Sequence, residues 1–477
     1  MTIKFGTDGW RAVMCDEFTF ANARQVTRAI VDYLREAGLT ERGLVIGYDT
    51  RFLADRFAEV AAEVCTAHGV PVFLTESDTP TPVVAHAILQ LRAAGALMFT
   101  ASHNPPEYQG LKFIPEYAGP AAPEITSRIE AFLAGGDLGT LAATVSDHPG
   151  PVSGNQAPIT GLDPKPAYLA HLRQLVDLDA IRQAGLKVIY DPMYATGRRY
   201  LPDLLEEAGC AYTVIHSTRD PLFGGETPEP NEEHLAELSY RLRAGEGDLG
   251  LATDGDADRF GIIDADGTYL SANRIIPLLF WHLVQKGLPG GVARTVATTH
   301  LLDRLAARYG RSVKETPVGF KYICQAMREG PIVIGGEESG GLSVGGHIPE
   351  KDGLLACLLV AEMRAVHGRP LTALLSEIMA EAGPCYSRRI DLRFQASEKE
   401  AIMRGMKERT PEKVDGVLVT SVNRADGVKL VLADGSWLLV RASGTEPLVR
   451  LYVEAESRDL LERRIEGARK VLASFLA

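Results

Sequence analysis

The chain repeats one order of elements three times. Each pass has a short apolar run, a stretch with helical apolar spacing and further short runs, the last of which leads into a polar loop. The polar loops that end the three passes are residues 100–105, 254–259 and 335–340. Short strand-like runs that alternate with helices predict βαβ units with mixed or parallel sheets, in which ligands bind beyond the carboxyl ends of the strands. We therefore expect three related α/β units whose polar loops can face one cleft.

The chain after Pro384 follows a different pattern. The strand-like runs there are 385–394, 428–432, 437–440 and 448–454, and the helical stretches are 398–409 and 460–476. Ala433–Ser436 has the composition of a hairpin turn. This part predicts a small α+β domain with an antiparallel sheet. Stretches rich in Gly, Pro and Ala suggest the boundaries, and the expected domains are residues 1–150, 151–268, 269–382 and 383–477.

Charge and composition exclude several classes of protein. The net charge is −12 and there is no strong basic patch, which argues against a nucleic-acid partner. Apolar runs fall short of the about 20 residues that span a membrane, and the charged first residues do not resemble a signal peptide. The six cysteines form no CxxC pair, which argues against zinc and a disulfide framework and favours a reducing cytoplasm. An anionic substrate would then need concentrated local donors.

Three carboxylates follow a strand at alternate positions. Asp254, Asp256 and Asp258 offer the hard oxygen ligands that suit Mg²⁺ or Ca²⁺. An EF-hand is the rival reading, but it needs Gly and Glu where this chain has Arg259 and Ala265, and it needs flanking helices. The sequence therefore predicts a metal site of another kind, next to the cation of Arg259.

A serine stands at another strand end. Ser102 lies in Thr100-Ala101-Ser102-His103-Asn104-Pro105, and it can act as a nucleophile if a neighbour activates it. Taken alone, an isolated serine in such a loop favours a polar turn over a nucleophile. Lys112 adds a cation on the strand that returns from it.

Two further loops offer ligands for a phosphorylated sugar. Arg441-Ala442-Ser443-Gly444-Thr445-Glu446-Pro447 combines a guanidinium, hydroxyls and backbone N–H groups, a set that can cradle a phosphate. Gly336-Glu337-Glu338-Ser339-Gly340-Gly341 offers carboxylates that suit sugar hydroxyls, although the loop taken alone favours a helix or strand cap.

Together these loops resemble those of the α-D-phosphohexomutase superfamily, the phosphoglucomutases and phosphomannomutases. The resemblance begins at Phe5-Gly6-Thr7-Asp8-Gly9-Trp10-Arg11 and continues, in the family's order, through TASHNP, DGDADR, GEESGG and RASGTEP. It covers nearly the whole chain. It implies three related α/β domains with mixed sheets and a C-terminal α+β domain, arranged around a central cleft.

The resemblance also implies a role for each matching residue. Ser102 would carry the transferable phosphate, with His103 and Lys112 acting beside it in proton transfer and charge balance, and with Arg11 and Arg259 as nearby cations. The implied Mg²⁺ ligands are Asp254, Asp256, Asp258 and the phosphate on Ser102. The implied substrate contacts are Lys321, Glu337, Ser339, Arg441, Ser443, Gly444 and Thr445.

The implied activity is interconversion of hexose 1-phosphate and hexose 6-phosphate through a hexose 1,6-bisphosphate, which also serves as activator. Glu338 stands where many glucose-specific members have Glu, but Gly340-Gly341-Leu342 departs from the usual loop endings, so activity on mannose remains open. The alternatives are a phosphomannomutase, a phosphoglucosamine mutase, a phosphatase that uses the same phosphoserine, and a phosphosugar-binding protein without turnover. We expect a small-molecule substrate, no nucleic acid or membrane partner, and a monomer or homodimer. Because the last domain must release and regrip phosphate, we also expect a hinge near Ala382–Pro384.

Overall fold

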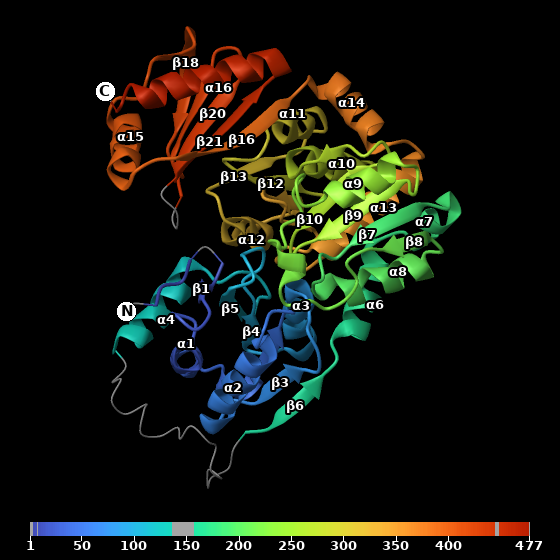
Figure 1. Ribbon diagram of the computed structural model, residues 1–477, viewed down its shortest axis with the longest axis vertical. Coiled ribbons are helices and arrows are strands. Elements are labelled where there is room, and N and C mark those ends of the chain that lie inside the picture. Colours follow the sequence, from blue (N-terminus) through green and yellow to red (C-terminus); the bar gives the residue numbers. More distant parts are fainter. Residues whose placement is uncertain (1–2, 7, 136–156, 444–447, 477) are drawn as a thin grey trace. The chain divides into compact units, whose positions relative to one another are not determined.

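A computed structural model describes residues 3–6, 8–135, 157–443 and 448–476 (Figure 1). Contacts within the chain divide it into two compact units. One unit comprises the chain up to Ser271 together with Ser339–Pro370, and the other comprises Ala272–Glu338 together with the chain from Leu371 onward. Within the described ranges, no helix is both long and apolar enough to cross a membrane.

The first sheet of the first unit is mixed. Its strands, in spatial order, are β1 (Trp10–Val13), β5 (Tyr108–Pro115), β4 (Gly95–Phe99), β2 (Leu44–Tyr48), β3 (Val72–Thr75) and β6 (Ile159–Leu162). Strands β4, β2, β3 and β6 are parallel, whereas β5 runs antiparallel to both β4 and β1. β6 follows residue 150, where the sequence suggested a boundary, yet it pairs with β3 of this sheet.

Helices cover both faces of this sheet. They are α1 (Phe20–Glu36), α2 (Ala54–Ala67), α3 (Thr81–Leu91) and α4 (Pro123–Gly135), with the short η1 (Thr40–Arg42). One core joins α1, α2 and α4 to the sheet and contains the stacked rings of Trp10 and Phe18. The second core places α3 against Val45, Ala96 and Met98. Strands covered on both faces explain the continuous apolar runs in the sequence.

The second sheet of this unit carries the aspartate loop. Its strands, in spatial order, are β11 (Tyr269–Leu270), β10 (Phe260–Asp264), β9 (Leu249–Thr253), β7 (Lys187–Asp191) and β8 (Ala211–Val214). The helices in this part of the chain are α6 (Lys165–Leu175), α7 (Leu178–Ala184), η2 (Thr196–Arg199), α8 (Leu201–Glu207), η3 (Phe223–Gly225) and α9 (Ala236–Arg243). β9 and β10 form an antiparallel hairpin whose connection is residues 254–259.

A later segment completes this part of the fold. After the short strand β15 (Leu342–Val344), helix α13 (Gly353–His367) packs against β9 and β10. Asp352 caps α13 by accepting a hydrogen bond from the Leu355 N–H, and the Gly353 N–H donates to the Ala257 carbonyl in the aspartate loop. Residues near 350 are therefore brought to the loop at 254–259.

The second unit contains the remaining two sheets. The parallel strands β13 (Val313–Thr316), β12 (Gly291–Thr295) and β14 (Ile332–Gly336) lie side by side in that order. The helices that accompany them are α10 (Ala272–Gln285), α11 (Leu301–Arg308), α12 (Phe320–Glu329) and α14 (Leu371–Ala382).

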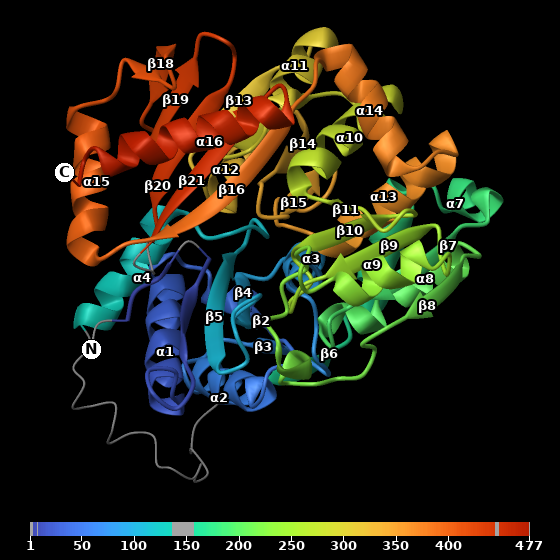
Figure 2. The same ribbon diagram turned by 45° about the horizontal axis from the view of Figure 1, so that its top comes forward.

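The last sheet is antiparallel throughout. Its strands, in spatial order, are β16 (Tyr386–Arg393), β21 (Leu448–Ala455), β20 (Trp437–Ala442), β19 (Val428–Leu432), β18 (Val417–Asn423) and β17 (Lys413–Val414). Helices α15 (Ala396–Glu408) and α16 (Arg458–Ala473) pack on one face, and Figure 2 shows α16 lying across it. The architecture confirms the predicted class: three related α/β domains with mixed sheets and a C-terminal α+β domain.

The two faces of this last sheet have different partners, because side chains alternate along a strand. Leu438 and Val440 face α15 and α16, whereas Trp437 and Leu439 pack in a cluster with Val296 of the preceding domain. The sequence expectation of a hinge at 382–384 stays a prediction, and any such movement would have to open this apolar contact.

Candidate active site

The serine loop follows the carboxyl end of β4. Ser102 is fully buried, and its φ of 51° lies in the left-handed region, which costs a non-glycine residue about 1–2 kcal/mol. Its hydroxyl donates to Asp254 Oδ2 over 2.9 Å and lies 3.4 Å from His103 Nδ1. A backbone held in an unfavourable conformation at such a position is typical of functional sites.

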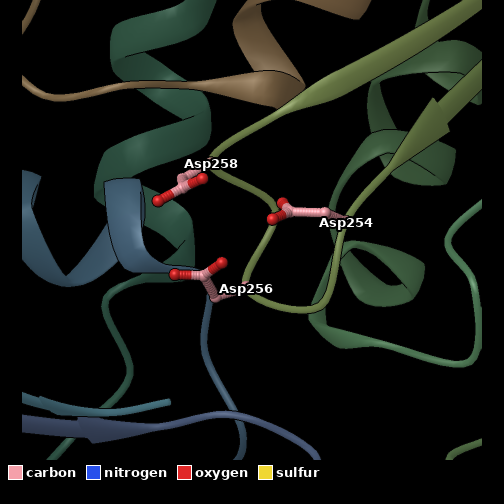
Figure 3. A group of neighbouring side chains, drawn as sticks. All are labelled: Asp254, Asp256 and Asp258. Atoms are coloured by element: carbon pink, nitrogen blue, oxygen red, sulfur yellow. The ribbon is translucent and has the colours of Figure 1, made fainter. Parts of the chain in front are cut away.

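The three aspartates form a compact group at the β9–β10 turn (Figure 3). One oxygen from each of Asp254, Asp256 and Asp258 lies within 4.8 Å of the others, and all three side chains are fully buried. Asp256 Oδ1 and Asp258 Oδ1 are buried and have no hydrogen-bond partner among the described residues. Buried carboxylates gathered this closely, two of them with an oxygen that lacks a hydrogen-bond partner, fit a hard divalent cation such as Mg²⁺. Strands flank the turn, so the EF-hand alternative is wrong.

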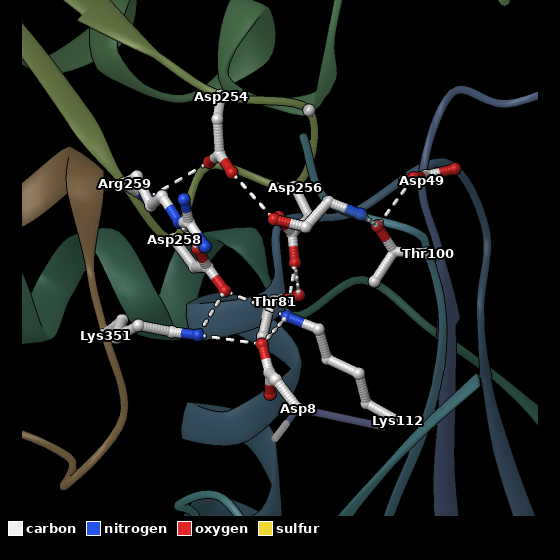
Figure 4. A network of polar contacts seen from close by, with 12 residues as sticks. Asp8, Asp49, Thr81, Thr100, Lys112, Asp254, Asp256, Asp258, Arg259 and Lys351 are labelled. Atoms are coloured by element: carbon white, nitrogen blue, oxygen red, sulfur yellow. Dashed lines mark hydrogen bonds and ion pairs between the residues drawn. The ribbon is translucent and has the colours of Figure 1, made fainter. Parts of the chain in front are cut away.

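Two lysines neutralise part of this acidic group (Figure 4). The Lys112 ammonium lies 2.8 Å from both Asp256 Oδ2 and Asp258 Oδ2, and 2.9 Å from Asp8 Oδ2. The Lys351 ammonium lies 2.8 Å from Asp258 Oδ2 and Asp8 Oδ2. Both lysines are buried, so these ion pairs are shielded from solvent.

The buried charges shift one another's pKa values. Burial, followed by repulsion from Asp258 and Asp256, raises the pKa of Asp254 well above its usual range. Burial also acts to raise the pKa of Asp256, but the Lys112 ammonium outweighs it and the pKa is lowered. Burial acts to lower the pKa of Lys112, but the carboxylates of Asp256 and Asp258 outweigh it and raise this pKa well above its usual value. The group therefore favours a charged lysine facing charged carboxylates.

His103 is held in its neutral form. Burial, and then the positive charges of Arg259 and Arg11, lower the pKa of its imidazole well below the ordinary value. A neutral imidazole 3.4 Å from the Ser102 hydroxyl can accept a proton. This geometry makes His103 a candidate base beside the serine.

The two predicted arginines lie at the same centre. Arg11 donates to Asn104 Oδ1 over 2.8 Å, and its guanidinium lies 3.5 Å from Asp8. The Arg259 backbone N–H donates to Asp254 Oδ1 over 3.0 Å, and its Nε lies 3.9 Å from Asp258 Oδ1. The first unit therefore brings Ser102, His103, Lys112, Arg11, Arg259 and the three aspartates together.

The predicted sugar and phosphate contacts fall mainly in the second unit. Lys321 lies in the first turn of α12, and the preceding Gly319 N–H donates to Glu337 Oε1 over 2.8 Å. Arg441 donates to Asp426 Oδ2, which also accepts from the Val318 N–H. The start of α12, Glu337 and Arg441 are thus connected within one unit.

The remaining predicted contacts have separate positions. Ser443 is buried, and its carbonyl accepts from the Lys399 ammonium over 2.6 Å. Ser339 belongs to the first unit, in the turn between Glu337 and β15. Gly444 and Thr445 lie outside the described residues.

Sequence reasoning missed three residues of the first unit's centre. Asp8 lies inside the Phe5–Arg11 motif but received no role, and Lys351 lies about 250 residues from the serine. Arg51 follows the apolar run 44–47 and also received no role. The signal that could have found Lys351 is the run Glu350-Lys351-Asp352-Gly353, a cluster of charges directly before an apolar helix.

Models of one known protein family match four successive segments of the chain. Four models of the phosphoglucomutase/phosphomannomutase family match: α/β/α domain I at residues 2–139, domain II at 166–267, domain III at 271–382 and the C-terminal domain at 394–470.

Relatives carry more than one activity in their names. The chain is 29% identical over 472 residues to a phosphoglucomutase/phosphomannomutase of Thermococcus kodakarensis, covering 99% of each protein. It is 30% identical to a phosphoglucomutase of Komagataeibacter xylinus, covering 95% of this chain and 87% of the relative. It is 31% identical to a protein of Methanopyrus kandleri named probable phosphoglucosamine mutase, covering 95% and 94%.

A solved structure has the same fold along the whole chain. The crystal structure of a candidate phosphomannomutase from Thermus thermophilus matches with a TM-score of 0.85 and 34% identity, covering 99% of each chain. With all four family domains matched in order, the chain belongs to the phosphoglucomutase/phosphomannomutase family, within the α-D-phosphohexomutase superfamily.

Proposed function

We propose that this protein interconverts hexose 1-phosphate and hexose 6-phosphate, with glucose as the preferred sugar, through a phosphoserine at Ser102. The single observation that carries the proposal is the convergence of the buried Ser102 hydroxyl, the three aspartates and two lysines at one centre. Serine, carboxylates and cations in this arrangement suit transfer of a phosphoryl group, in which positioning and charge neutralisation provide most of the catalysis.

Each residue at this centre has a part in the transfer. The P–O bond to Ser102 breaks as a sugar hydroxyl forms a new P–O bond. The hydroxyl proton passes to a nearby base, for which neutral His103 is the candidate, and from there to the Ser102 oxygen that leaves the phosphorus. Lys112 and Lys351 balance the negative charge, together with Arg11 and Arg259. Asp254, Asp256 and Asp258 would hold Mg²⁺, which supplies Lewis-acid stabilisation of the transferring group when bound.

The sugar must then present its other end. The hexose 1,6-bisphosphate formed by the first transfer reorients so that its other end faces the serine. Ser102 then takes back the other phosphate. Lys321, Glu337 and Ser339 are proposed to hold the sugar, and Arg441, Ser443, Gly444 and Thr445 to hold the phosphate that is not reacting. A bisphosphate of the same kind would prime the serine and act as activator.

The choice of hexose rests on Glu338. This residue lies in the loop Gly336–Gly341, and Arg389 and Tyr452 of the same unit interact with it electrostatically. The names of the relatives include mannose and glucosamine activities, so a phosphomannomutase or phosphoglucosamine mutase is the second candidate.

One coupled assay separates these candidates. The purified protein is supplied with Mg²⁺, a catalytic amount of hexose 1,6-bisphosphate and, in turn, glucose 1-phosphate, mannose 1-phosphate or glucosamine 1-phosphate, and both 6-phosphate and inorganic phosphate are measured. We expect the largest kcat/KM for glucose 1-phosphate and no release of inorganic phosphate. Turnover of glucosamine 1-phosphate alone would reject the glucose assignment, release of inorganic phosphate would identify a phosphatase, and no conversion would favour a binding protein.

A further inference from the structure

Arg51 is buried beneath the serine loop. It follows β2, directly beside β4, whose end leads into Ser102, so the parallel arrangement of these strands brings their two loops together. The Arg51 side chain is completely buried, and a buried charge is costly unless nearby partners compensate it.

Those partners are the backbone of the serine loop. Arg51 Nη2 donates to the carbonyls of Ser102 at 2.7 Å and Asn104 at 2.6 Å. Arg51 Nη1 donates to the carbonyls of Pro105 at 2.8 Å and Tyr108 at 3.0 Å. One planar guanidinium therefore fastens four carbonyls of a single turn, which needs the fixed fork of an arginine.

Arg51 is also linked to the Ser102 N–H, through Asp49 and Thr100. Arg51 Nε lies 3.2 Å from Asp49 Oδ2. This same oxygen accepts a hydrogen bond from the Thr100 hydroxyl over 2.7 Å (Figure 4). Thr100 Oγ1 in turn accepts from the Ser102 N–H over 2.8 Å. Both the N–H and the carbonyl of Ser102 are thus held by one connected network.

The serine loop needs such support because Ser102 adopts a positive φ. Without the network, the loop would relax toward ordinary conformations, and the hydroxyl would move away from Asp254. We propose that Arg51 is a positioning residue for phosphoryl transfer, which fixes the 102–108 backbone and thereby aims the Ser102 oxygen at the aspartate group. This inference rests on the proposed function of Ser102.

The main test compares two arginines of the same domain. Arg51→Lys keeps the positive charge beside Asp49 but loses the fork. The control is Arg42→Lys, because Arg42 also donates to two carbonyls, those of Arg92 and Ala93, but lies at η1. We expect Arg51→Lys to lower kcat by about 10²-fold, as a misplacement of about 1 Å does. KM should stay within about threefold and the pH profile of kcat should keep its shape, because Arg51 supplies no proton.

A second variant covers the case in which Arg51→Lys does not fold. Thr100→Val keeps the shape of the side chain and removes the hydroxyl that joins Asp49 to the Ser102 N–H. We expect it to lower kcat by about tenfold, with KM nearly unchanged. Wild-type kcat in folded Thr100→Val and in folded Arg51→Lys would overturn the inference, as would a fall in kcat matched by the loss of folded protein.

Hydrogen exchange of the protein without substrate separates failure of the inference from failure of the proposed function. Arg51→Lys should speed exchange in a peptide covering residues 99–110, and Arg42→Lys should not. If the wild type shows no mutase activity, the proposed function fails, and faster loop exchange would still support the holding role. If the wild type is active while Arg51→Lys keeps both its kcat and its loop exchange, only the inference fails.

Discussion

The Ser102 hydroxyl donates a hydrogen bond to Asp254, 152 residues away in the sequence, over 2.9 Å. This contact joins the loop after β4 of one sheet to the turn after β9 of another. It depends on a close approach of backbones, because a Cβ atom at Gly255 would lie 2.5 Å from the Ser102 carbonyl oxygen. A glycine between Asp254 and Asp256 thus sets the distance between Ser102 and the aspartates.

Gly255→Ala should therefore push the two loops apart. We expect kcat to fall by about 10²-fold, because the added methyl displaces the reacting oxygen while most of the core stays intact. The control is Gly330→Ala, since a Cβ there meets nothing within 4 Å. Steady-state kinetics and thermal unfolding of both variants give the comparison. Full activity in Gly255→Ala would mean that the loops tolerate separation.

Asp256→Asn should abolish the stabilising effect of Mg²⁺. A cation that binds only the folded state raises the melting temperature, and removing one of three carboxylate charges weakens that binding. The wild type should melt higher with Mg²⁺ than with a chelator, whereas Asp256→Asn should show no difference and activity lower by orders of magnitude. Asp266→Asn removes the same charge at an exposed position and should behave as wild type. Equal Mg²⁺ stabilisation of both variants would refute the metal assignment.

A stack of three histidines should make the first unit sensitive to acid. The rings of His86 and His171 lie 4.9 Å apart, and those of His171 and His347 lie 5.1 Å apart. His347 Nε2 lies 2.8 Å from the carboxylate of Asp352, and the ring of Tyr168 meets His86 edge-on. Burial, and then the neighbouring histidines, lower the pKa of His86 to about 4.

The sign of the effect follows from that pKa. The unfolded chain protonates this imidazole near its ordinary value of 6.5, but the folded protein resists protonation until about 4. The free energy of unfolding should therefore fall as pH drops from about 6.5 to 4. His86→Phe keeps an aromatic ring in the stack and should make the fall in the free energy of unfolding shallower. Urea unfolding at about pH 7.5, 6 and 5 would measure this. A wild-type slope in His86→Phe would contradict the account.

Trp437 should anchor the last domain to the one before it. Its side chain is buried, its indole N–H donates to Glu454 Oε1 over 2.8 Å, and the Lys429 ammonium lies 4.2 Å from its ring. Trp437→Ala should reduce the free energy of unfolding of the second unit by about 3–5 kcal/mol. Denaturant unfolding measures the loss, and Leu418→Ala, at an exposed apolar side chain of the same unit, is the control. A change as small as that of the control would show that this junction is weak.

The sequence predicted the parts of the site that are local. Asp254, Asp256 and Asp258 occupy one turn, so their spacing alone predicted a metal site. Ser102 and His103 are neighbours in a loop that, taken alone, favoured a polar turn, and their roles came from the resemblance to the family. The alternation of strands and helices likewise predicted the α/β class, because apolar periodicity reflects burial directly.

Other parts depend on tertiary contacts that spacing does not encode. Lys351 reaches Asp258 only because α13 returns from later in the chain to pack on β9 and β10. Arg51 contacts the serine loop only because β2 and β4 are neighbours in the sheet. β6 joins the first sheet beyond the stretch that looked like a linker, since strand pairing is decided across the fold.

The most direct test of the account follows one phosphoryl group. The protein is primed with a bisphosphate labelled with ³²P, freed of excess label, mapped by peptide mass spectrometry and mixed in a single turnover with unlabelled glucose 6-phosphate. The account predicts label on Ser102, its transfer to the sugar as glucose 1,6-bisphosphate, and neither labelling nor turnover in Ser102→Ala. Label on another residue of the active protein, or its release as inorganic phosphate, would contradict the account.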